Sequence, residues 1–553
     1  MASRTRVFFL NAISLTATAL MIRAVSVIFN VYISNAAGSE AIGLFSLLSS
    51  VYAFSITLAT AGINLGTTRL VSEAVALKNE SLAKKRATCA LLLCTVTGII
   101  SSILLFILSE PLAIYALGDV RAKIPLKVLS LTLTPIAICS CLSGYFTAVR
   151  RVKANAAFQL VSQGVKFFAT VFLLSNLATK DCESACTVLV VGGAISEFFS
   201  FIINFSLYLF DRRKLRSKAA ASEKYPTPGI FKELISINLP VTVSACIRSA
   251  LSMIQHILIP RGLYKNGGSW SLALSSYGAL HGMAMPLLLF PSAFTSAFAG
   301  LLIPEISACC AQKDFERLKR TSYRALSLSL FFSVGVSGIM LFFSRELGMT
   351  VYKNAEAALY IRVLAPLIPV MYIDSAVDAI LKGSGHQVYS MNVNIADTLT
   401  ACLFALTLVP MIGIWGYVIS IYATEILNTS LSLLKLISVS KMRPKAFAQV
   451  FKPIICIIGA TNIARLALAI NPIKNSIFTL IAGIILSLLL YLALLFITKT
   501  VTSEETEFLS ASLLSEKHYN QKYRTFFKSG NSFKKNDPSQ KSKLPLRRIT
   551  RLK

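Results

Sequence analysis

The sequence predicts an all-α, polytopic membrane protein with about fourteen transmembrane helices. Only 14% of its 553 residues are charged and the mean hydropathy is +0.66, whereas soluble globular proteins carry about 25% charged residues. Apolar windows of about 20 residues recur from end to end, each long enough to cross a bilayer. Because lipid offers the backbone no hydrogen-bond partners and alternating, barrel-type strands are absent, these windows are expected to be helices.

The expected spans follow the apolar windows. Their approximate limits are 7–33, 42–63, 87–108, 128–148, 157–178, 187–210, 235–258, 277–303, 325–344, 359–381, 391–411, 414–435, 449–471 and 475–498. The first span is too long for the core of a signal peptide, so no cleavage is expected.

The distribution of Lys and Arg predicts the orientation. With the N-terminus inside, the N-terminal segment and the even-numbered loops carry 26 of these residues, and the odd-numbered loops carry 9. Because cytoplasmic loops are enriched in Lys and Arg, both termini are expected in the cytoplasm.

The two halves of the chain resemble each other at an offset of 225 residues. In "IRAVSVIFNVYI" (22–33) and "IRSALSMIQHILI" (247–259), an Ile-Arg-small triplet is followed by an amide seven residues after the Arg, Asn30 or Gln255. Arg248 lies six spans after Arg23, so the two helices run in the same direction, which predicts a parallel repeat of two six-helix lobes. The expected parts are an N-lobe (1–210), a basic cytoplasmic linker (211–234), a C-lobe (235–440), two further spans (441–498) and a tail (499–553).

Three expected spans carry a cation on a polar helix face. The three stripes are Thr16, Arg23, Ser26 and Asn30; Ser244, Arg248, Ser252 and Gln255; and Asn155, Gln159, Ser162 and Lys166. A cation in mid-membrane costs at least about 2.5–3.5 kcal/mol and usually faces a water-filled cavity or a bundle interior. We expect a shared cationic cavity, which suits an anionic substrate such as a phosphate or pyrophosphate. The alternative is that internal acids such as Glu197 neutralise each cation.

Other ionisable residues are candidates for coupling transport to an ion. Asp374, Asp378 and Asp397 are the candidate ligands for sodium or protons. His256 and His281, near the outer ends of their spans, are either proton-coupling groups or hydrogen-bonded interfacial histidines. The sequence has no enzyme motif, no ATP-binding loop and no Cys/His set with zinc-ligand spacing, so neither catalysis nor a cofactor is expected.

The basic tail accounts for part of the net charge of +30. Residues 517–553 hold twelve Lys or Arg against one acid, Asp537, so this cytoplasmic segment is expected to be disordered. It either adheres to anionic lipid headgroups or is a solvated tail that reinforces orientation. Nucleic-acid binding is not expected, because no folded basic module accompanies the tail.

Three stretches resemble a known family. They are "AIGLFSLLSSVYAFSITLATAGINLGTTRLVSEA" (41–74), "SSYGALHGMAMPLLLFPSAFTSAFAGLLIPEISA" (275–308) and "LKGSGHQVYSMNVNIADT" (381–398). They resemble the stage V sporulation protein B-like family, in the polysaccharide-transporter branch of the superfamily of multidrug and oligosaccharidyl-lipid exporters. The resemblance covers about residues 7–498.

The resemblance implies a flippase that works by alternating access in the bacterial cytoplasmic membrane. Its implied substrate is a lipid-linked saccharide carrying pyrophosphate, such as the peptidoglycan precursor lipid II, with the last two spans forming a groove for the lipid tail. Arg23 matches the first-span arginine that lipid II flippases place in their cavity, so Arg23, Lys166 and Arg248 are expected to hold the phosphates, with Asn30 and Gln255 nearby. Span five departs from the family, because "SQGVKFF" (162–168) has Gly164 and Lys166 where an acid and an Arg are usual.

Three other functions compete with the flippase. A drug or organic-cation antiporter of the same fold predicts an acidic cavity. A glycosyltransferase or polymer ligase needs catalytic acids or a large outer loop, and the longest expected outer loop has only about 20 residues. A non-transporting scaffold would recruit partners through its tail. A monomer is the expected oligomeric state.

Overall fold

The computed structural model describes residues 2–60, 62–77, 79–149, 152–177, 181–216, 227–442, 446–470, 476–498 and 500, with most side chains described from Met21 onward. Residues 7–500 form one compact unit, to which everything below refers. The tail expected at 499–553 lies outside the described residues except for residue 500, and so do the side chains of Thr16 and Asn155.

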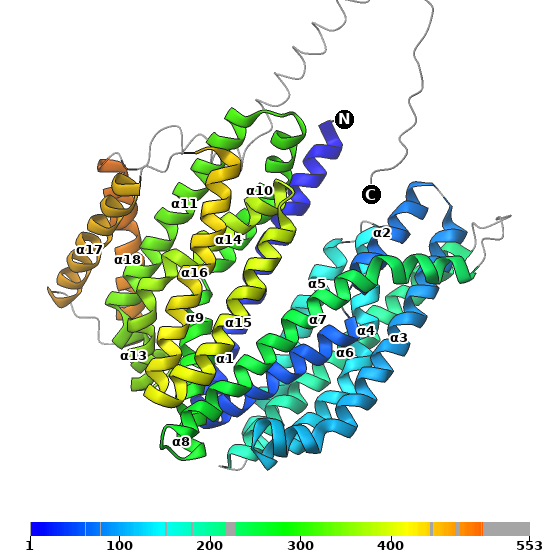
Figure 1. Cartoon of the computed structure of the whole chain (residues 1–553), viewed down its shortest axis with the longest axis horizontal. Coiled ribbons are helices and arrows are strands. Elements are labelled where there is room, and N and C mark those ends of the chain that lie inside the picture. Colours follow the sequence, from blue (N-terminus) through cyan, green and yellow to red (C-terminus); the bar gives the residue numbers. More distant parts are fainter. Residues whose placement is uncertain are drawn as a thin grey trace, which may run out of the picture. The chain divides into compact units, whose positions relative to one another are not determined.

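The regular elements of the described chain are all helical. They are α1 (Ala2–Thr60), α2 (Ile63–Ala76), α3 (Glu80–Pro111), η1 (Leu112–Leu117), η2 (Val120–Ala122), α4 (Lys123–Ala148), α5 (Val152–Leu177), α6 (Cys182–Arg216), α7 (Thr227–Lys265), α8 (Trp270–Tyr277), η3 (Gly278–Ala284), α9 (Met285–Leu289), α10 (Ser292–Ala311), α11 (Phe315–Phe342), α12 (Ser344–Glu346), η4 (Leu347–Val351), α13 (Ala355–Leu364), η5 (Ala365–Leu367), α14 (Ile368–Gly383), α15 (Gln387–Ile412), α16 (Ile414–Ser440), α17 (Ala446–Ile470) and α18 (Ser476–Ile497). The predicted fold class is confirmed (Figure 1).

Thirteen stretches of the described chain are long and apolar enough to cross a membrane, which is close to the fourteen expected. The first two expected spans form one stretch, Met21–Val75, and the expected span 277–303 belongs to two, Trp270–Leu289 and Ser292–Ala311. The expected span 414–435 is a helix, α16, but it is not among the thirteen, because residues such as Glu425, Asn428 and Ser432 lower its hydropathy.

Two glycines divide the first stretch. Gly38 interrupts α1 with a φ of 79°, so α1 consists of two helices joined at a bend. Gly62, with a φ of 75°, separates α1 from α2. These left-handed conformations are open to glycine at little steric cost. The bend at Gly38 reverses the direction of the chain. The helices before and after it correspond to the first two expected spans.

Successive helices therefore end alternately at two ends of the unit, which we name after a residue at each. The Trp270 end contains Gly38, Asp119 and Trp270, and the Glu233 end contains Asn79, Glu233 and Lys313. In Figure 1, α8 marks the Trp270 end and α2 the Glu233 end.

Helices α2 to α6 pack together into a first bundle. Its core includes Leu70, Tyr145 and Tyr208, and the rings of the two tyrosines meet edge to face at 5.2 Å. Helices α10, α11, α14, α15 and α16 form a second bundle, which is extended at the Trp270 end by α8, η3, α9, η4 and α13. Helices α17 and α18 pack on α11, where the Tyr491 hydroxyl donates to the carbonyl of Phe331 at 2.8 Å.

Helix α7 contacts both bundles. Its first half packs on α2 and α3, where the Arg86 guanidinium lies 3.3 Å from Glu233 and 3.4 Å from Glu73. Its second half packs on α15, where Gly262 lies against Val409. The segment 211–234, expected to be a linker, is helical at both ends, because α6 continues to Arg216 and α7 begins at Thr227.

Candidate functional site

A polar cavity of about 290 Å³ lies between α1, α5 and the irregular helix η3. It is lined by Ser26, Phe29, Asn30, Ile33, Ile42, Phe45, Ser46, Ser49, Gln163, Lys166, His281, Gly282 and Pro286. Lys166 is the one Lys or Arg in this lining, and the lining contains no Asp or Glu. Two of the predicted substrate residues, Asn30 and Lys166, are therefore brought together.

Lys166 reaches the cavity from α5. Its ammonium lies 5.5 Å from the centroid of the Phe29 ring, in a cation–π arrangement. Glu197 on α6 interacts with it electrostatically, but no salt bridge within 4 Å joins these residues in the described part of the chain. In this conformation the alternative of direct pairing with an internal acid is thus not realised at Lys166.

Arg23 lies one helical turn along α1 from Ser26 and contacts the second bundle. Its guanidinium donates to the carbonyl of Leu289 at 2.9 Å and to Ser292 Oγ at 3.3 Å. Pro291 interrupts the helix here, and the amide of Ala293 bonds to Phe290 instead of Leu289. The helix break leaves this carbonyl without its usual amide donor, and Arg23 and Ser292 Oγ, which donates at 2.6 Å, share it instead.

Asn30 makes a similar contact at the next irregularity. Its amide donates to the carbonyl of Gly282 at 3.0 Å, and its oxygen accepts a hydrogen bond from the Tyr352 hydroxyl at 3.4 Å. Gly282 lies in η3, a π-helical segment in which the regular hydrogen-bond pattern is widened. Such π-helical turns are frequent at functional sites.

Arg248 and Gln255 do not line this cavity. Arg248 is exposed on α7, and Gln255 is partly buried on the same helix. The three cationic stripes therefore do not meet in one cavity in this conformation. Sequence periodicity places residues on a helix face, but it does not tell which neighbour that face meets.

The predicted coupling acids lie in the second bundle. Asp374 accepts a hydrogen bond from Asn428 at 3.4 Å, and Asp378 forms a salt bridge with Lys382 at 2.5 Å. One carboxylate oxygen of Asp374 and one of Asp397 are buried without a hydrogen-bond partner in the described structure. No three Asp, Glu, His or Cys residues among those described are arranged to hold a metal ion.

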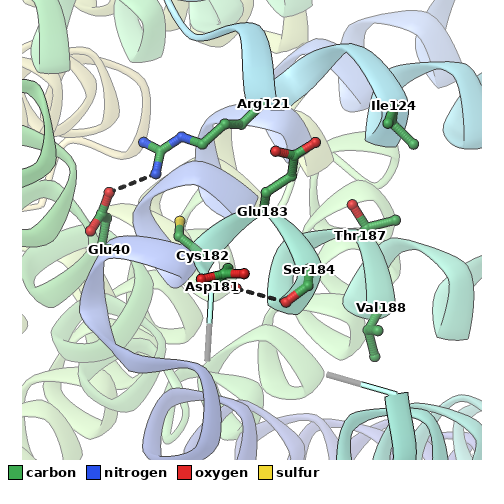
Figure 2. A pocket seen from close by; sticks show the side chains of 9 residues that line it. All are labelled: Glu40, Arg121, Ile124, Asp181, Cys182, Glu183, Ser184, Thr187 and Val188. Atoms are coloured by element: carbon green, nitrogen blue, oxygen red, sulfur yellow. Dashed lines mark hydrogen bonds and ion pairs between the residues drawn. The ribbon is translucent and has the colours of Figure 1, made fainter. Parts of the chain in front are cut away.

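A polar seam at the Trp270 end joins the two bundles. Glu40, just after the Gly38 bend, accepts hydrogen bonds from Arg121 at 2.9 Å and from Ser271 at 2.6 Å. Figure 2 shows Glu40 and Arg121 pointing toward one another beside an open pocket of about 740 Å³. On the same face, the indole of Trp270 donates to Asp119 at 3.0 Å.

Asp119 is the carboxylate of this seam that accepts hydrogen bonds from both Arg121 and Trp270. Its burial alone would raise the pKa, but hydrogen bonds from Arg121 and Trp270 favour the carboxylate and hold the pKa of Asp119 below its usual value. It is therefore ionised at neutral pH, and its charge is matched by Arg121 at 2.8 Å.

The helices cross closely within this seam. Ser39 Oγ lies 2.6 Å from Ser275 Oγ, and Gly43 packs directly on the backbone of α8. A Cβ on Gly43 would lie 2.0 Å from the carbonyl oxygen of Leu274, and one on Gly278 would lie 2.1 Å from that of Ser39. Only glycine permits this approach without displacing the backbone.

Sequence reasoning missed the seam and part of the cavity. The close approach of Gly43 and Gly278 could be suspected from isolated glycines within apolar spans. The two interruptions between 278 and 291 have a signal in their glycines and prolines, which break helical regularity. Nothing in a single sequence pairs Asp119 with Trp270, which lies 151 residues away.

Comparison with known proteins places the chain in a family. The model of the polysaccharide biosynthesis protein family matches residues 8–309, and a MatE family model matches residues 240–407. The chain is 28% identical to stage V sporulation protein B of Bacillus subtilis (strain 168), over 80% of this chain and 85% of that protein. It is 19% identical to sporulation protein YkvU of the same organism, over 77% and 94% of the two chains.

Solved structures show the same fold. The lipid II flippase MurJ in an inward closed conformation is 12% identical, with a TM-score of 0.63 over 89% of this chain and 98% of that one. An inward-facing multidrug resistance MATE family transporter is 15% identical, with a TM-score of 0.56 over 78% and 99%. Since one family model matches more than half of the chain, this multi-pass membrane protein belongs to the polysaccharide biosynthesis protein family.

Proposed function

We propose that the protein is a flippase that moves a lipid-linked saccharide carrying pyrophosphate, of which lipid II is one example, across the bacterial cytoplasmic membrane. The observation that carries the proposal is the charge of the cavity, which has Lys166 in its lining and no carboxylate. The similarity to stage V sporulation protein B and the fold shared with MurJ support a substrate of this class.

The cavity and Arg23 suit the head of such a substrate. Among apolar residues the lining holds hydroxyl and amide groups, which suit sugar hydroxyls, and Lys166, which would bind a phosphate. Arg23 is already bonded to Leu289 and Ser292, so it would hold the second phosphate only after releasing those contacts. Arg248 and Gln255 would join the site when α7 moves relative to α1.

The contacts between the bundles support alternating access as the mechanism. Among the residues whose side chains are described, the side-chain hydrogen bonds from residues 21–121 to residues 261–352 run from the Trp270 end to the middle of α1, the level of Arg23. Toward the Glu233 end, Gly62 and Gly66 lie against Asn238 in the first half of α7, and Thr57 donates to Ser249 near the middle of that helix at 3.2 Å. With both termini cytoplasmic, this conformation would be closed outside, and parting the Trp270-end seam would release the substrate outward.

We further propose roles for three acids of the second bundle and for the basic tail, and an oligomeric state. Asp374, Asp378 and Asp397 would take up a coupling cation, because two of them hold buried oxygens without partners. The basic tail would bind anionic lipid headgroups, and the protein would act as a monomer.

Translocation of lipid II by the purified full-length protein in liposomes tests the proposal. Lys166→Ala and Arg23→Ala each remove a cation, and loss of one charge-assisted contact of about 1.5–3 kcal/mol would weaken substrate binding by about tenfold or more. Arg320→Ala, at an exposed cation on α11 near the Glu233 end, is the matched control and should transport normally.

Wild-type rates in both cavity variants would overturn the cationic site. A well-folded protein that binds no pyrophosphate-linked lipid but exports cationic drugs would be an antiporter instead, as the fold shared with the multidrug transporter allows. If deletion of residues 510–553 abolished function in cells while transport in liposomes was never seen, the scaffold would be favoured.

A further inference from the structure

Two histidines lie side by side where the cavity meets the seam. The rings of His256 on α7 and His281 in η3 have centroids 4.4 Å apart, and His281 lines the cavity. The chain has four histidines. The other two are His386, at the Glu233 end, and His518, in the tail, so this pairing is specific to the wall between cavity and seam.

Each imidazole is bonded to a buried tyrosine. The Tyr277 hydroxyl lies 3.0 Å from His256 Nδ1, and the Tyr417 hydroxyl lies 3.4 Å from His281 Nδ1. A tyrosine hydroxyl can donate to a neutral imidazole nitrogen and accept from a protonated one. The cluster can therefore take up a proton without losing its hydrogen bonds.

The surroundings favour at most one proton on the pair. Neither imidazole is paired with a carboxylate in the described chain. Two imidazolium charges 4.4 Å apart would repel each other strongly in a partly buried setting. The neighbouring elements carry titratable or charged residues that include Lys166 on α5, Arg248 and Arg261 on α7, Tyr277 on α8, Tyr352 after η4, Glu356, Tyr360 and Arg362 on α13, Asp397 and Cys402 on α15, and Tyr417, Tyr422 and Glu425 on α16.

The pair is mechanically connected to the seam. The ring of His281 stacks on Tyr277 at 5.2 Å with an interplanar angle of 10°. Tyr277 is fully buried and directly precedes Gly278, and the backbone of Ser39 and Gly43 packs against Gly278. With the seam closed, both imidazoles are only partly exposed, a setting that disfavours the charged imidazolium.

We propose that His256 and His281 form a single proton-binding site whose protonation opens the seam at the Trp270 end. A proton binds better to the conformation in which the cluster is hydrated, so by linkage acid shifts the population toward the open seam. This deepens the proposed function, because it names a coupling ion. It rests on the alternating access of that proposal but not on its substrate.

Hydrogen–deuterium exchange of the full-length protein in lipid nanodiscs, without substrate, tests the proposal between pH 8 and pH 5.5. After correction for the intrinsic pH dependence of exchange, the opening constant of seam peptides 36–44 and 270–280 should rise as the pH falls. A single linked proton limits the rise to about tenfold per pH unit. Peptides at the Glu233 end should not follow it.

Variants assign the effect to the pair. The double variant His256→Gln/His281→Gln should make the seam opening constant independent of pH, each single histidine variant should shift the midpoint, and His386→Gln should match the wild type. Tyr417→Phe keeps the packing but removes one hydrogen bond, so it should shift the midpoint without abolishing the response. A flat wild-type profile, or an unchanged slope in the double variant, would overturn the proposal. Transport of lipid II is measured separately, so its absence alongside a normal seam profile would count against the proposed substrate only.

Discussion

Arg23 makes a structural contact in the present conformation and is also a proposed substrate-binding residue. Its guanidinium donates a hydrogen bond to the carbonyl of Leu289 at the Pro291 break. This contact offsets part of the cost of placing a cation among apolar spans. We expect Arg23→Ala to destabilise the protein by about 1–3 kcal/mol, because a polar group inside the bundle loses a charged donor. Arg23→Lys, which keeps the charge but not the guanidinium fork, should recover only part of this loss.

Thermal unfolding of the purified variants measures this effect. The melting temperatures should fall in the order wild type, Arg23→Lys, Arg23→Ala. An alanine variant as stable as the wild type would show that Arg23 contributes only to substrate binding.

Asp119 predicts a pH-dependent contribution to stability. Because its pKa is lowered in the folded protein, the stabilisation is fully present above the ordinary aspartate value of 3.8 and is lost as the pH falls through the folded pKa. Asp119→Asn should therefore lower the melting temperature at pH 7 and at pH 5 by the same amount. The difference in melting temperature between the variant and the wild type should become smaller below about pH 4. A gap that stays constant down to pH 3 would mean that the hydrogen bond to Trp270, and not the charge, carries the effect.

The crossing of α1 and α8 is the element on which closure of the seam depends. Gly278→Ala would place a Cβ 2.1 Å from the backbone oxygen of Ser39, a clash that backbone on both sides cannot easily relieve. We expect exchange of seam peptides 36–44 and 270–280 to accelerate by about tenfold or more, since overpacking typically costs about 1–3 kcal/mol. Gly164→Ala is the control, because nothing lies within 4 Å of its added Cβ. If the seam peptides were equally protected from hydrogen exchange in the two variants, the seam would tolerate separation of these helices.

Hydropathy predicted the helices well, because the hydrocarbon core imposes the same length and apolarity on each span. It also separated the first two spans on either side of Gly38 and predicted α16, although that helix carries Glu425 and Asn428 toward the interior of the second bundle. What it missed is the interruption at Pro291, which divides the expected span 277–303. For the site, periodicity found Asn30 and Lys166 but also selected Arg248, because helical spacing carries no information on how α7 is rotated against α1 and α5.

At the scale of the whole molecule, α1 and α7 connect the two bundles. The first helix of α1 is held to the second bundle by Arg23 and Asn30, and the helix after Gly38 packs in the first, where Tyr52 meets Thr132 at 2.5 Å. Helix α7 makes the complementary crossing, from Glu233 beside Arg86 to Gly262 beside Val409. Rocking of the bundles would therefore bend these two helices, which correspond to each other in the sequence repeat.

The orientation of the molecule in the membrane is the last prediction, and two native cysteines report on it. Cys182 is partly exposed at the Trp270 end, where it lines the pocket shown in Figure 2, and Cys310 is partly exposed at the Glu233 end. From the excess of Lys and Arg at the Glu233 end, we predict that this end lies in the cytoplasm. In variants that retain only one of these thiols, a membrane-impermeant maleimide should label Cys182 on intact cells, but Cys310 only after permeabilisation. A variant that retains only the fully buried Cys94 should stay unlabelled in both conditions. The reverse pattern for Cys182 and Cys310 would invert the topology, and the seam would then close the cytoplasmic side instead of the outer one.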